Sequence, residues 1–394
     1  RNNDLENAAA AWQRMMDEYP AAELSYRGLF LAGISYYRLG RYEEAQTIFQ
    51  RALVLGSTPA DKAKAYLWIG KSNEALGQAD DARNAWELAK NADPTDYYSI
   101  RAAEILDGIG MFDIPGSYDL GYDLASERTE AENWLRDTFS VPDETDLSGL
   151  GELSANPAIT RIAKFHELGL YREAINQAEL LRADLQQDVV NTYRLMNFLV
   201  ELHLYQPAVY ASRQILNLAG MNDLTSLTAP IYFTHIRFGA YFRDYIASAA
   251  KDNGIPILIL YSLIRQESMF NPYIGSTAGA LGLMQMIPDT ALDNVKRLSW
   301  PENYTNTDLF LGKVNLTLGS YHLRRLYSQT FSGNMQLALA AYNGGEGSVA
   351  TWLNLAPYDP DLFQEIMRFS ETQEYLMQIT EFLNIYKLVY ERVQ

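Results

Sequence analysis

Apolar positions at helical spacing occupy most of this chain, and stretches of strand-like alternation are scarce. Within the first quarter, one pattern occurs three times: an alanine is followed four residues later by a large aromatic residue. The alanine and the aromatic residue then share one face of a helix. The pairs are separated by a constant 37 residues and are Ala8 with Trp12, Ala45 with Phe49, and Ala82 with Trp86.

A fixed period of this length is typical of an array of helical hairpins, because a single hairpin cannot bury its own apolar face. The pairs Gly33 with Gly70 and Gly40 with Gly77 keep the same interval. Small residues allow two helices to approach closely, and the aromatic ring then fills the space between hairpins. The pattern resembles a tetratricopeptide repeat lengthened by three residues, and it returns around Gly169.

Turn-forming residues divide the rest of the chain. Pro94 is predicted to end the last helix of the repeats, and segments 113–127 and 140–157, rich in Gly, Pro, Ser and Asp, are predicted connectors that flank one helix. Residues 187–250 are again helical in pattern, and their many Tyr and Phe side chains are predicted to be core. The expected domains are helical repeats over 1–110, a linker and continuation of the superhelix over 111–230, and a further domain over 231–394.

An almost wholly apolar segment, residues 255–264, predicts a central buried helix that continues to about Ser268. Pro256 suits the first turn of this helix, and the Asn-Pro pair at 271–272 cannot continue it. Glu267 therefore lies in the last turn, where the helix dipole disfavours a carboxylate.

The position of Glu267 supports two interpretations. A helix end with apolar neighbours raises the pKa of a carboxyl group, and a carboxyl group that keeps its proton near neutral pH can act as a general acid. Alternatively, Glu267 is a solvated residue of the helix end that pairs with Arg265 or Lys296, since structural carboxylates outnumber catalytic ones. The residues of the helix alone leave both interpretations open.

The loop after this helix suits a sugar ligand. Three glycines within residues 275–282 permit tight turns or close approach of the backbone, and Ser276 and Gln285 offer uncharged hydrogen-bonding groups. It is not a phosphate loop, because no Gly-Lys-Ser/Thr follows and a helix rather than a strand precedes it. A second cluster at 338–352 ends a helix of small residues at a glycine pair, and Tyr342 there is either exposed at the helix end or packed in the core.

Composition and charge narrow the function classes. The chain of 394 residues is 48% apolar and 21% charged, which is typical of a globular protein, and its formal net charge of −17 argues against nucleic acid as a partner. No cysteine is present, so disulfides and thiol catalysis are excluded. The four scattered histidines lack metal-site spacing, so no metal or cofactor is expected. The longest apolar run is far shorter than the ~20 residues of a membrane-spanning helix.

The segment 267–291 resembles the signature of the soluble lytic transglycosylases. That signature is Glu-Ser-x-Phe-x-Pro, followed by Ser-x-x-Gly-Ala-x-Gly-Leu-Met-Gln-x-x-Pro-x-Thr-Ala, and every fixed position is matched here. Three later segments, residues 315–326, 337–345 and 369–376, resemble the other motifs of the family, in the same order. The resemblance covers roughly residues 231–394.

This resemblance implies a mainly all-α fold, in which an N-terminal α-superhelix of helical hairpins precedes a C-terminal lysozyme-like α+β domain with a small hairpin. It also implies a lytic transglycosylase, which cleaves the β-1,4 bond between N-acetylmuramic acid and N-acetylglucosamine in peptidoglycan and forms 1,6-anhydromuramic acid ends. The family uses a single glutamate as acid and base, and Glu267 occupies that position. The positions matching residues that bind the sugars are Ser276, Gln285, Tyr342, Asn343 and Glu371.

Three positions depart from the family pattern. Gln373 stands where arginine is usual, Gly344 replaces an alanine, and Ile287 stands where methionine is common. These differences concern the binding of sugar and peptide rather than the acid.

Two other functions stay open at this stage. A muramidase would use the same fold with water as the nucleophile, and such a hydrolase usually needs a second carboxylate. Asp289 is the nearest candidate, although Asp in the first turn of a helix is also a routine capping choice. A non-catalytic scaffold would work through its repeats and use its C-terminal domain as a peptidoglycan anchor, but it would not need an acid at Glu267.

The expected partners are the glycan strands of peptidoglycan, with a protein partner on the helical repeats as a further expectation. The expected location is the periplasm or the extracytoplasmic cell envelope. The sequence begins without methionine inside a predicted helix, so we expect it to be a segment of a longer protein whose export signal or lipid anchor lies outside this sequence.

Overall fold

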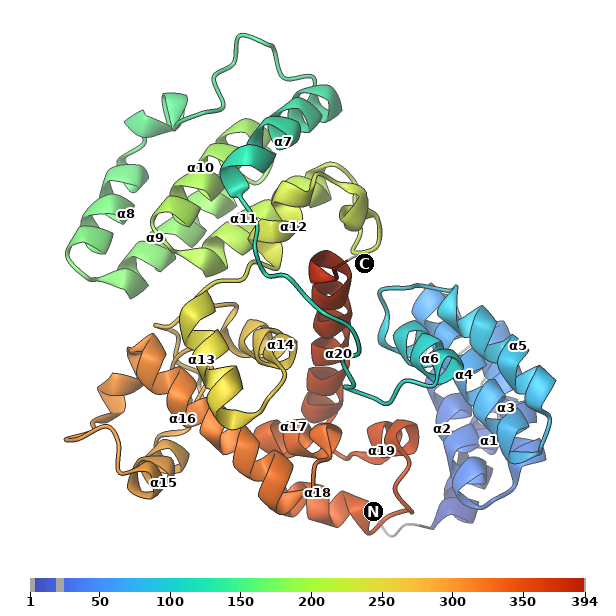
Figure 1. Ribbon diagram of the computed structural model, residues 1–394. Coiled ribbons are helices and arrows are strands. Elements are labelled where there is room, and N and C mark those ends of the chain that lie inside the picture. The colour runs from blue at the N-terminus through green and yellow to red at the C-terminus, as the bar shows by residue number, and fades with distance from the viewer. Residues whose placement is uncertain (1–3, 19–24, 393–394) are drawn as a thin grey trace. The chain divides into compact units, whose positions relative to one another are not determined.

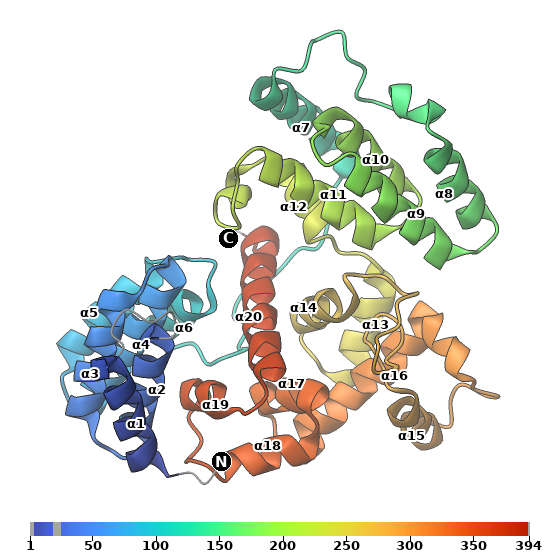
Figure 2. The same cartoon turned by 180° about the vertical axis from the view of Figure 1, so that it is seen from behind.

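The computed structural model describes residues 4–18 and 25–392, and helices make up nearly all of its regular structure. The chain divides into two compact units, which can be followed by colour and label in Figures 1 and 2. Unit 1 consists of Arg1–Pro115 and Leu326–Asn384, and unit 2 consists of Gly116–Arg325 and Ile385–Gln394. The domain boundaries expected from the sequence lie at 110/111 and 230/231. The division into two units does not test them, so they stay a prediction.

Unit 1 begins with consecutive antiparallel helices in which each helix packs against the next, drawn in blue to cyan in Figure 1. Its later part holds shorter helices and most of one long helix, of which residues 385–390 are grouped with unit 2. The helices are α1 (Leu5–Glu18), α2 (Ser25–Arg38), α3 (Tyr42–Leu55), α4 (Pro59–Ala75), α5 (Ala79–Lys90), α6 (Tyr97–Asp107), α17 (Met335–Gly344), α18 (Glu346–Leu353), α19 (Pro360–Ile366) and α20 (Ser370–Tyr390).

The 37-residue period corresponds to a repeated helix contact. A Cβ atom at Gly33 would overlap the ring of Phe49, and a Cβ atom at Gly70 would overlap the indole of Trp86, so α2 packs on α3 as α4 packs on α5. The missing side chain of each glycine thus makes room for the aromatic ring one helix later. The predicted close approach at the small residues is confirmed. The aromatic rings fill the space within a hairpin, and the ring centre of Phe49 also lies 5.8 Å from that of Trp68 in the next hairpin.

The C-terminal part of unit 1 shares a core with these hairpins. Leu362 and Ile366 of α19 belong to the same buried cluster as Phe30, Phe49 and Trp68. Residues more than 290 positions apart in the sequence therefore exclude water together, so the first hairpins and α19 support one another.

Unit 2 contains two further helical hairpins, α8–α9 and α10–α11, and then the helices around Glu267. Figure 2 shows these hairpins in green and the later helices in yellow to orange. The helices are α7 (Leu124–Phe139), α8 (Pro157–Glu167), α9 (Tyr171–Asp184), α10 (Val189–Glu201), α11 (Tyr205–Leu218), α12 (Ile231–Arg237), α13 (Arg243–Asn253), α14 (Ile257–Ser268), α15 (Pro288–Leu298) and α16 (Gly312–Arg324).

Helix α14 is the predicted central buried helix, since every residue from Leu258 to Arg265 is buried. It ends at Ser268, as predicted. Pro256, however, is the N-cap residue and not part of the first turn, because its extended ψ of 131° places it just outside the helix. Across the described ranges 4–18 and 25–392, no helix is long and apolar enough to cross a membrane.

The small hairpin expected beside α14 is reduced to isolated bridges. Gly275 pairs with Leu281, and Leu281 pairs with Met286, both antiparallel. Two short turns therefore replace regular strands, and the described part of the chain contains no sheet beyond such bridges.

Candidate active site

Glu267 lies in the last turn of α14, and its side chain is partly exposed. The next residue anchors the helix end, because the Ser268 hydroxyl donates a 2.7 Å hydrogen bond to the carbonyl of Leu283. Arg265 is directed into the interior: its guanidinium donates to the carbonyl of Arg237 and lies 4.0 Å from the ring centre of Phe238. Helix α14 thus places the carboxyl of Glu267 at the edge of a rigid core.

The chain turns sharply after Glu267. Met269 and Phe270 have φ angles of 50° and 60°, a left-handed conformation that non-glycine residues adopt only at some cost in energy. Phe270 is fully buried and packs against the rings of Tyr241 and Tyr261, at 5.3 and 6.1 Å between ring centres. This apolar contact offsets the strain and fixes where the following loop begins.

The loop is closed by its own hydrogen bonds. The N–H of Ser276 donates to the carbonyl of Ala280 at 2.9 Å, and the N–H of Ala280 donates to the Ser276 hydroxyl oxygen at 3.0 Å. In that bond the hydroxyl is an acceptor, so its own proton is still available for a ligand. Ser276 is exposed, which agrees with a residue that contacts substrate.

Gln285 is held in a strained conformation. Its φ is 44°, and its side-chain amide donates to the carbonyl of Gly282 at 2.8 Å. Such strain persists only where the surroundings enforce it, and it gathers at functional sites. The structure therefore gives Gln285 a fixed orientation inside the loop.

Asn315 of α16 holds the loop in place. It was included in the segment 315–326 in the sequence analysis but was given no role of its own. It is completely buried, and its amide donates to the carbonyls of Leu281 and Leu309 at 2.8 and 2.9 Å. Its oxygen accepts from the N–H of Met284 at 2.8 Å. A Cβ atom at Gly282 would overlap this amide, so the glycine is required for the close contact. An asparagine inside an otherwise apolar helix pattern was the available signal.

Tyr342, Asn343 and Glu371 lie in unit 1. Tyr342 and Asn343 occupy the end of α17, where Tyr342 is partly buried and Asn343 is exposed. Glu371 is exposed in the first turn of α20, where the helix dipole favours a carboxylate. The hydroxyl of Thr372 donates to the side-chain oxygen of Asn343 at 2.6 Å, so the two helix ends are joined at this point.

The departures at Gln373 and Gly344 have structural reasons. The Gln373 amide donates to the carbonyls of Gln364, Glu365 and Met367 at 3.0 to 3.3 Å, and it thereby satisfies the open C-terminal turn of α19. A Cβ atom at Gly344 would lie 2.9 Å from the Thr372 hydroxyl oxygen, so alanine would crowd the contact to Asn343. These two substitutions adjust the packing of α17, α19 and α20.

Asp289, the second carboxylate that a muramidase would need, is exposed in the first turn of α15. The N-cap residue of this helix is Ile287, which makes no side-chain cap bond, so Asp289 is not the cap itself. Its position in the first turn of the helix is favourable for a carboxylate through the helix dipole alone.

A pocket of about 530 Å³ lies beside Ser276, between α9 and the loop. Arg172 lines it, donating to the carbonyl of Tyr273 at 2.7 Å, and Asn176, Gln206 and Asn271 contribute uncharged amides. These groups suit a polar sugar or a ligand with one negative charge better than a ligand with several phosphates, since a single guanidinium is present in the lining. Among the described residues, His, Asp and Glu form no group that could hold a metal ion.

Comparison with known proteins identifies the region that contains this site. Residues 244–360 match the family described as "Transglycosylase SLT domain". The chain carries a transglycosylase SLT domain. Residues 26–58 and 64–96, which precede the SLT domain, match tetratricopeptide repeats, so the resemblance inferred from the motifs and from the 37-residue period is confirmed.

Curated relatives match a part of the chain. The soluble lytic murein transglycosylases of Salmonella typhimurium and Escherichia coli K12 are each 34% identical over 153 residues, which is 38% of this chain and 24% of the relative. A putative soluble lytic murein transglycosylase of Haemophilus influenzae is 30% identical over 159 residues. The matched segment thus spans about a quarter of the length of these relatives.

Solved structures extend the likeness in fold to nearly the whole chain. An inactive mutant of the lytic transglycosylase Slt from Pseudomonas aeruginosa has a TM-score of 0.68 at 22% identity, over 98% of this chain and 56% of that chain. The 70-kDa soluble lytic transglycosylase of Escherichia coli has a TM-score of 0.57 at 18% identity, over 98% of this chain and 60% of that chain. The expected fold class, a helical superhelix with an SLT domain of the lysozyme-like type, is confirmed.

Proposed function

We propose that this protein is a lytic transglycosylase that cleaves the β-1,4 bond between N-acetylmuramic acid and N-acetylglucosamine in peptidoglycan. The observation that carries the proposal is Glu267, placed within the SLT domain at the end of a buried helix and next to a loop that Asn315 holds in place. A partly exposed acid on a rigid support is what general acid catalysis requires.

In the proposed reaction, Glu267 serves first as acid and then as base. It donates its proton to the glycosidic oxygen while the bond from that oxygen to C1 of the muramic acid breaks. The 6-hydroxyl of the same muramic acid attacks C1, and its proton passes to the Glu267 carboxylate. The intramolecular hydroxyl competes well with water because it is already held near C1. The product ends in 1,6-anhydromuramic acid, and no second carboxylate is needed.

Five further residues are proposed to contact the glycan. On the α14 side, Ser276 and Gln285 offer a hydroxyl and an amide from a fixed loop. The remaining three residues are Tyr342, Asn343 and Glu371, at the ends of α17 and α20.

A hydrolytic muramidase is the second candidate function. It would need Asp289 to activate water or stabilise the positive charge that develops at C1. The helix-dipole account of Asp289 requires no catalytic role, and we therefore place the transglycosylase first. A non-catalytic scaffold is the weakest alternative, because an acid at Glu267 would then serve no purpose.

The periplasm or the extracytoplasmic cell envelope is the proposed location, since the substrate lies there. A protein partner on the repeats is also proposed. Such a contact would cover exposed apolar side chains such as Val54 of α3, which is 83% exposed, and Leu88 of α5, which is 53% exposed.

Mass spectrometry of muropeptides after digestion of purified peptidoglycan tests the reaction. We expect products that end in anhydromuramic acid, one water lighter than products with reducing ends. Glu267→Gln should keep the fold, because the amide has the same shape, and should lose nearly all turnover. Reducing ends as the main product would favour the muramidase, and full activity of the glutamine variant would contradict both enzymes.

A further inference from the structure

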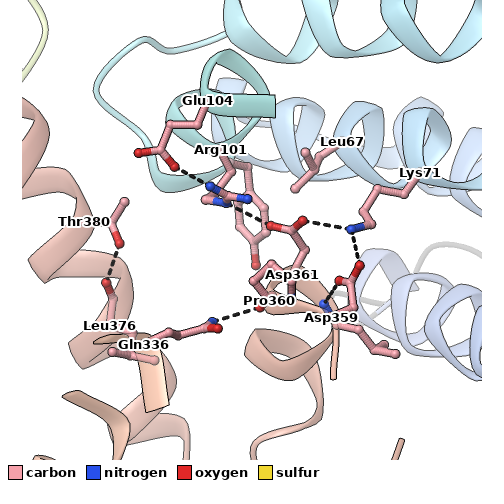
Figure 3. Close-up of polar contacts among 12 residues, drawn as sticks. Leu67, Lys71, Arg101, Glu104, Gln336, Asp359, Pro360, Asp361, Leu376 and Thr380 are labelled. Carbon is pink, nitrogen blue, oxygen red and sulfur yellow. Dashed lines mark hydrogen bonds and ion pairs between the residues drawn. The ribbon is translucent and has the colours of Figure 1, made fainter. Parts of the chain in front are cut away.

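A largely buried cluster of charged side chains joins the first hairpins to α19 within unit 1. Lys71 of α4 lies 2.9 Å from one carboxylate oxygen of Asp361 and 2.7 Å from Asp359. Arg101 of α6 lies 2.9 Å from the other oxygen of Asp361 and also pairs with Glu104. Figure 3 shows Asp361 between the two cations, and its side chain is 3% exposed.

The side chains of the cluster are charged, and each charge has a partner of opposite sign within the cluster. Burial by itself would raise the pKa of Asp361, but the charges of Arg101 and Lys71 outweigh burial and hold that pKa below its usual value. Removing one partner would leave the other charges buried without compensation. The cluster therefore fixes the start of α19 against α4 and α6.

A second pair of contacts holds α19 from the same side. Tyr98 of α6 donates its hydroxyl to Glu365 at 2.8 Å, and Lys64 of α4 lies 3.2 Å from the other oxygen of Glu365. Because α19 has only seven residues, its own hydrogen bonds cannot stabilise it or fix its place. Its position is set by the hairpins.

From α19, one buried contact leads to the helix that carries Tyr342. Gln336 in the first turn of α17 is 2% exposed, and its amide donates to the carbonyl of Pro360 at 2.8 Å. The oxygen of the same amide accepts from the Tyr358 hydroxyl at 2.8 Å. Figure 3 shows Gln336 reaching Pro360, directly before Asp361.

Other contacts lead from α19 to the helix that carries Glu371. The side-chain amide of Gln373 donates to the carbonyl of Gln364 at the end of α19. In the opposite direction, the side-chain amide of Gln364 donates to the backbone carbonyl of Gln373 at 2.8 Å. The neighbouring Thr372 donates to Asn343 at 2.6 Å. The start of α19 is therefore connected to the first turn of α17, the helix that carries Tyr342 at its other end, and the end of α19 is connected to the first turn of α20, which presents Glu371.

We infer that Asp361 is a positioning residue for Tyr342, Asn343 and Glu371, and that the first hairpins of the repeat array support catalysis without contacting the substrate. The inference rests on the proposed function, because it assigns the three residues to the reaction. It adds a role for the repeats that is independent of any protein partner. A shift of about 1 Å in a group that acts on the reacting bond can cost roughly 100-fold in rate, so a small displacement of α19 suffices.

A double-mutant cycle tests the inference. Asp361→Asn keeps the shape of the side chain and removes its charge, and Tyr342→Phe removes the group that it is inferred to position. We expect Asp361→Asn to lower kcat about tenfold and to change KM less than about threefold. In the Tyr342→Phe background the same substitution should lower kcat by a smaller factor, because one of the three positioned groups is already absent.

The matched control is Asp96→Asn, which removes one carboxylate from the N-cap of α6, where asparagine caps equally well. Its kcat should equal that of the original protein. If Asp361→Asn lowers kcat by the same factor in both backgrounds, or leaves kcat unchanged, the inference is wrong. If Asp361→Asn does not fold, Gln336→Met replaces it in the cycle. This substitution removes the hydrogen bond to the Pro360 carbonyl and leaves no buried charge without a partner. The same changes in kcat are then expected in the two backgrounds.

Hydrogen exchange separates this inference from the proposed function. Asp361→Asn should accelerate amide exchange in residues 369–374 more than Asp96→Asn does, whether or not the protein cleaves glycans. Unchanged exchange there would overturn the positioning role. An original protein that forms no anhydromuramic acid would instead overturn the proposed reaction, and the exchange result would still stand.

Discussion

The side-chain oxygen of Asn315 accepts a 2.8 Å hydrogen bond from the N–H of Met284, and through this bond helix α16 holds the loop that follows Glu267. The Asn315 amide also binds two carbonyls on either side of this contact. One buried side chain therefore binds three backbone groups, and one of them, the Leu281 carbonyl, also accepts a hydrogen bond from the N–H of Met286.

Asn315→Ala should destabilise the protein by about 2–4 kcal/mol, because the Met284 N–H and the Leu309 carbonyl each lose a buried hydrogen bond, while the Leu281 carbonyl keeps its bond from the N–H of Met286. It should also reduce turnover at temperatures where the variant is folded, since the loop around Gln285 is no longer fixed. Urea unfolding and product formation measure the two effects. The control is Asn294→Ala, which removes a buried amide that donates to the Leu318 carbonyl at 3.3 Å and accepts from the Arg325 guanidinium at 3.4 Å. If both variants lose activity equally, Asn315 has no particular connection to the site.

Tyr342→Phe should lower turnover more than stability. The ring stays packed, and loss of the hydroxyl should cost at most ~1–2 kcal/mol of unfolding free energy. Tyr261→Phe is a suitable comparison, because that hydroxyl is buried without a hydrogen-bond partner among the described residues. It should leave both stability and turnover unchanged or slightly improve stability. A large drop in melting temperature with normal specific activity for Tyr342→Phe would indicate a purely structural tyrosine.

Gln373→Leu should destabilise the protein by about 1–3 kcal/mol, because the carbonyls at the end of α19 lose their donor. Gln373→Arg should be tolerated, since a guanidinium can donate to the same carbonyls and arginine is usual at this position in the family. Thermal unfolding of the two variants checks the claim. Equal stability of the leucine variant and the original protein would show that water satisfies these carbonyls.

Stability should fall in mild acid because of His322 in α16. Burial, aided by the charge of Arg325, lowers the pKa of His322 from 6.5 to about 4. Between pH 6.5 and about 4, His322 binds a proton in the unfolded chain but not in the folded protein. The free energy of unfolding is therefore unaffected by His322 above pH 6.5 and decreases as the pH falls toward 4. The loss should be on the order of 2–3 kcal/mol.

Urea unfolding at pH 7 and pH 4.5 measures this effect, with His322→Gln as the comparison. The variant cannot gain a proton at this position, so its stability should change less between the two pH values. Parallel behaviour of the variant and the original protein would assign the acid sensitivity to other groups.

Local patterns in the sequence were sufficient for features that depend on neighbouring residues. The 37-residue interval predicted an array of helical hairpins with close approach at small residues, and the structure shows this approach where Gly33 meets Phe49 on consecutive helices. The apolar run before Glu267 predicted a buried helix and its end at Ser268. Each depends on periodicity or on a helix signal that is visible within about 20 residues.

Features that depend on distant contacts were not visible in the sequence. Asp361 has the same local pattern as any acidic residue in the first turn of a helix, and only the fold brings Lys71 and Arg101 to it. The role of Gln373 likewise depends on the end of another helix, α19. Interactions of this kind are specified by three-dimensional packing rather than by residue spacing.

The ion pair between Arg101 and Asp361 has a consequence for protein synthesis. The two residues are 260 positions apart, and a ribosome adds about 5–20 residues per second, so Arg101 is added to the chain roughly 13–52 s before its partner. Until residue 361 is made, Arg101 pairs with Glu104 of its own helix but lacks Asp361, and Lys71 lacks both of its carboxylate partners, Asp359 and Asp361. A chain terminated before that point would expose both cations and the apolar surface around them, which makes incomplete products easy targets for cellular proteases.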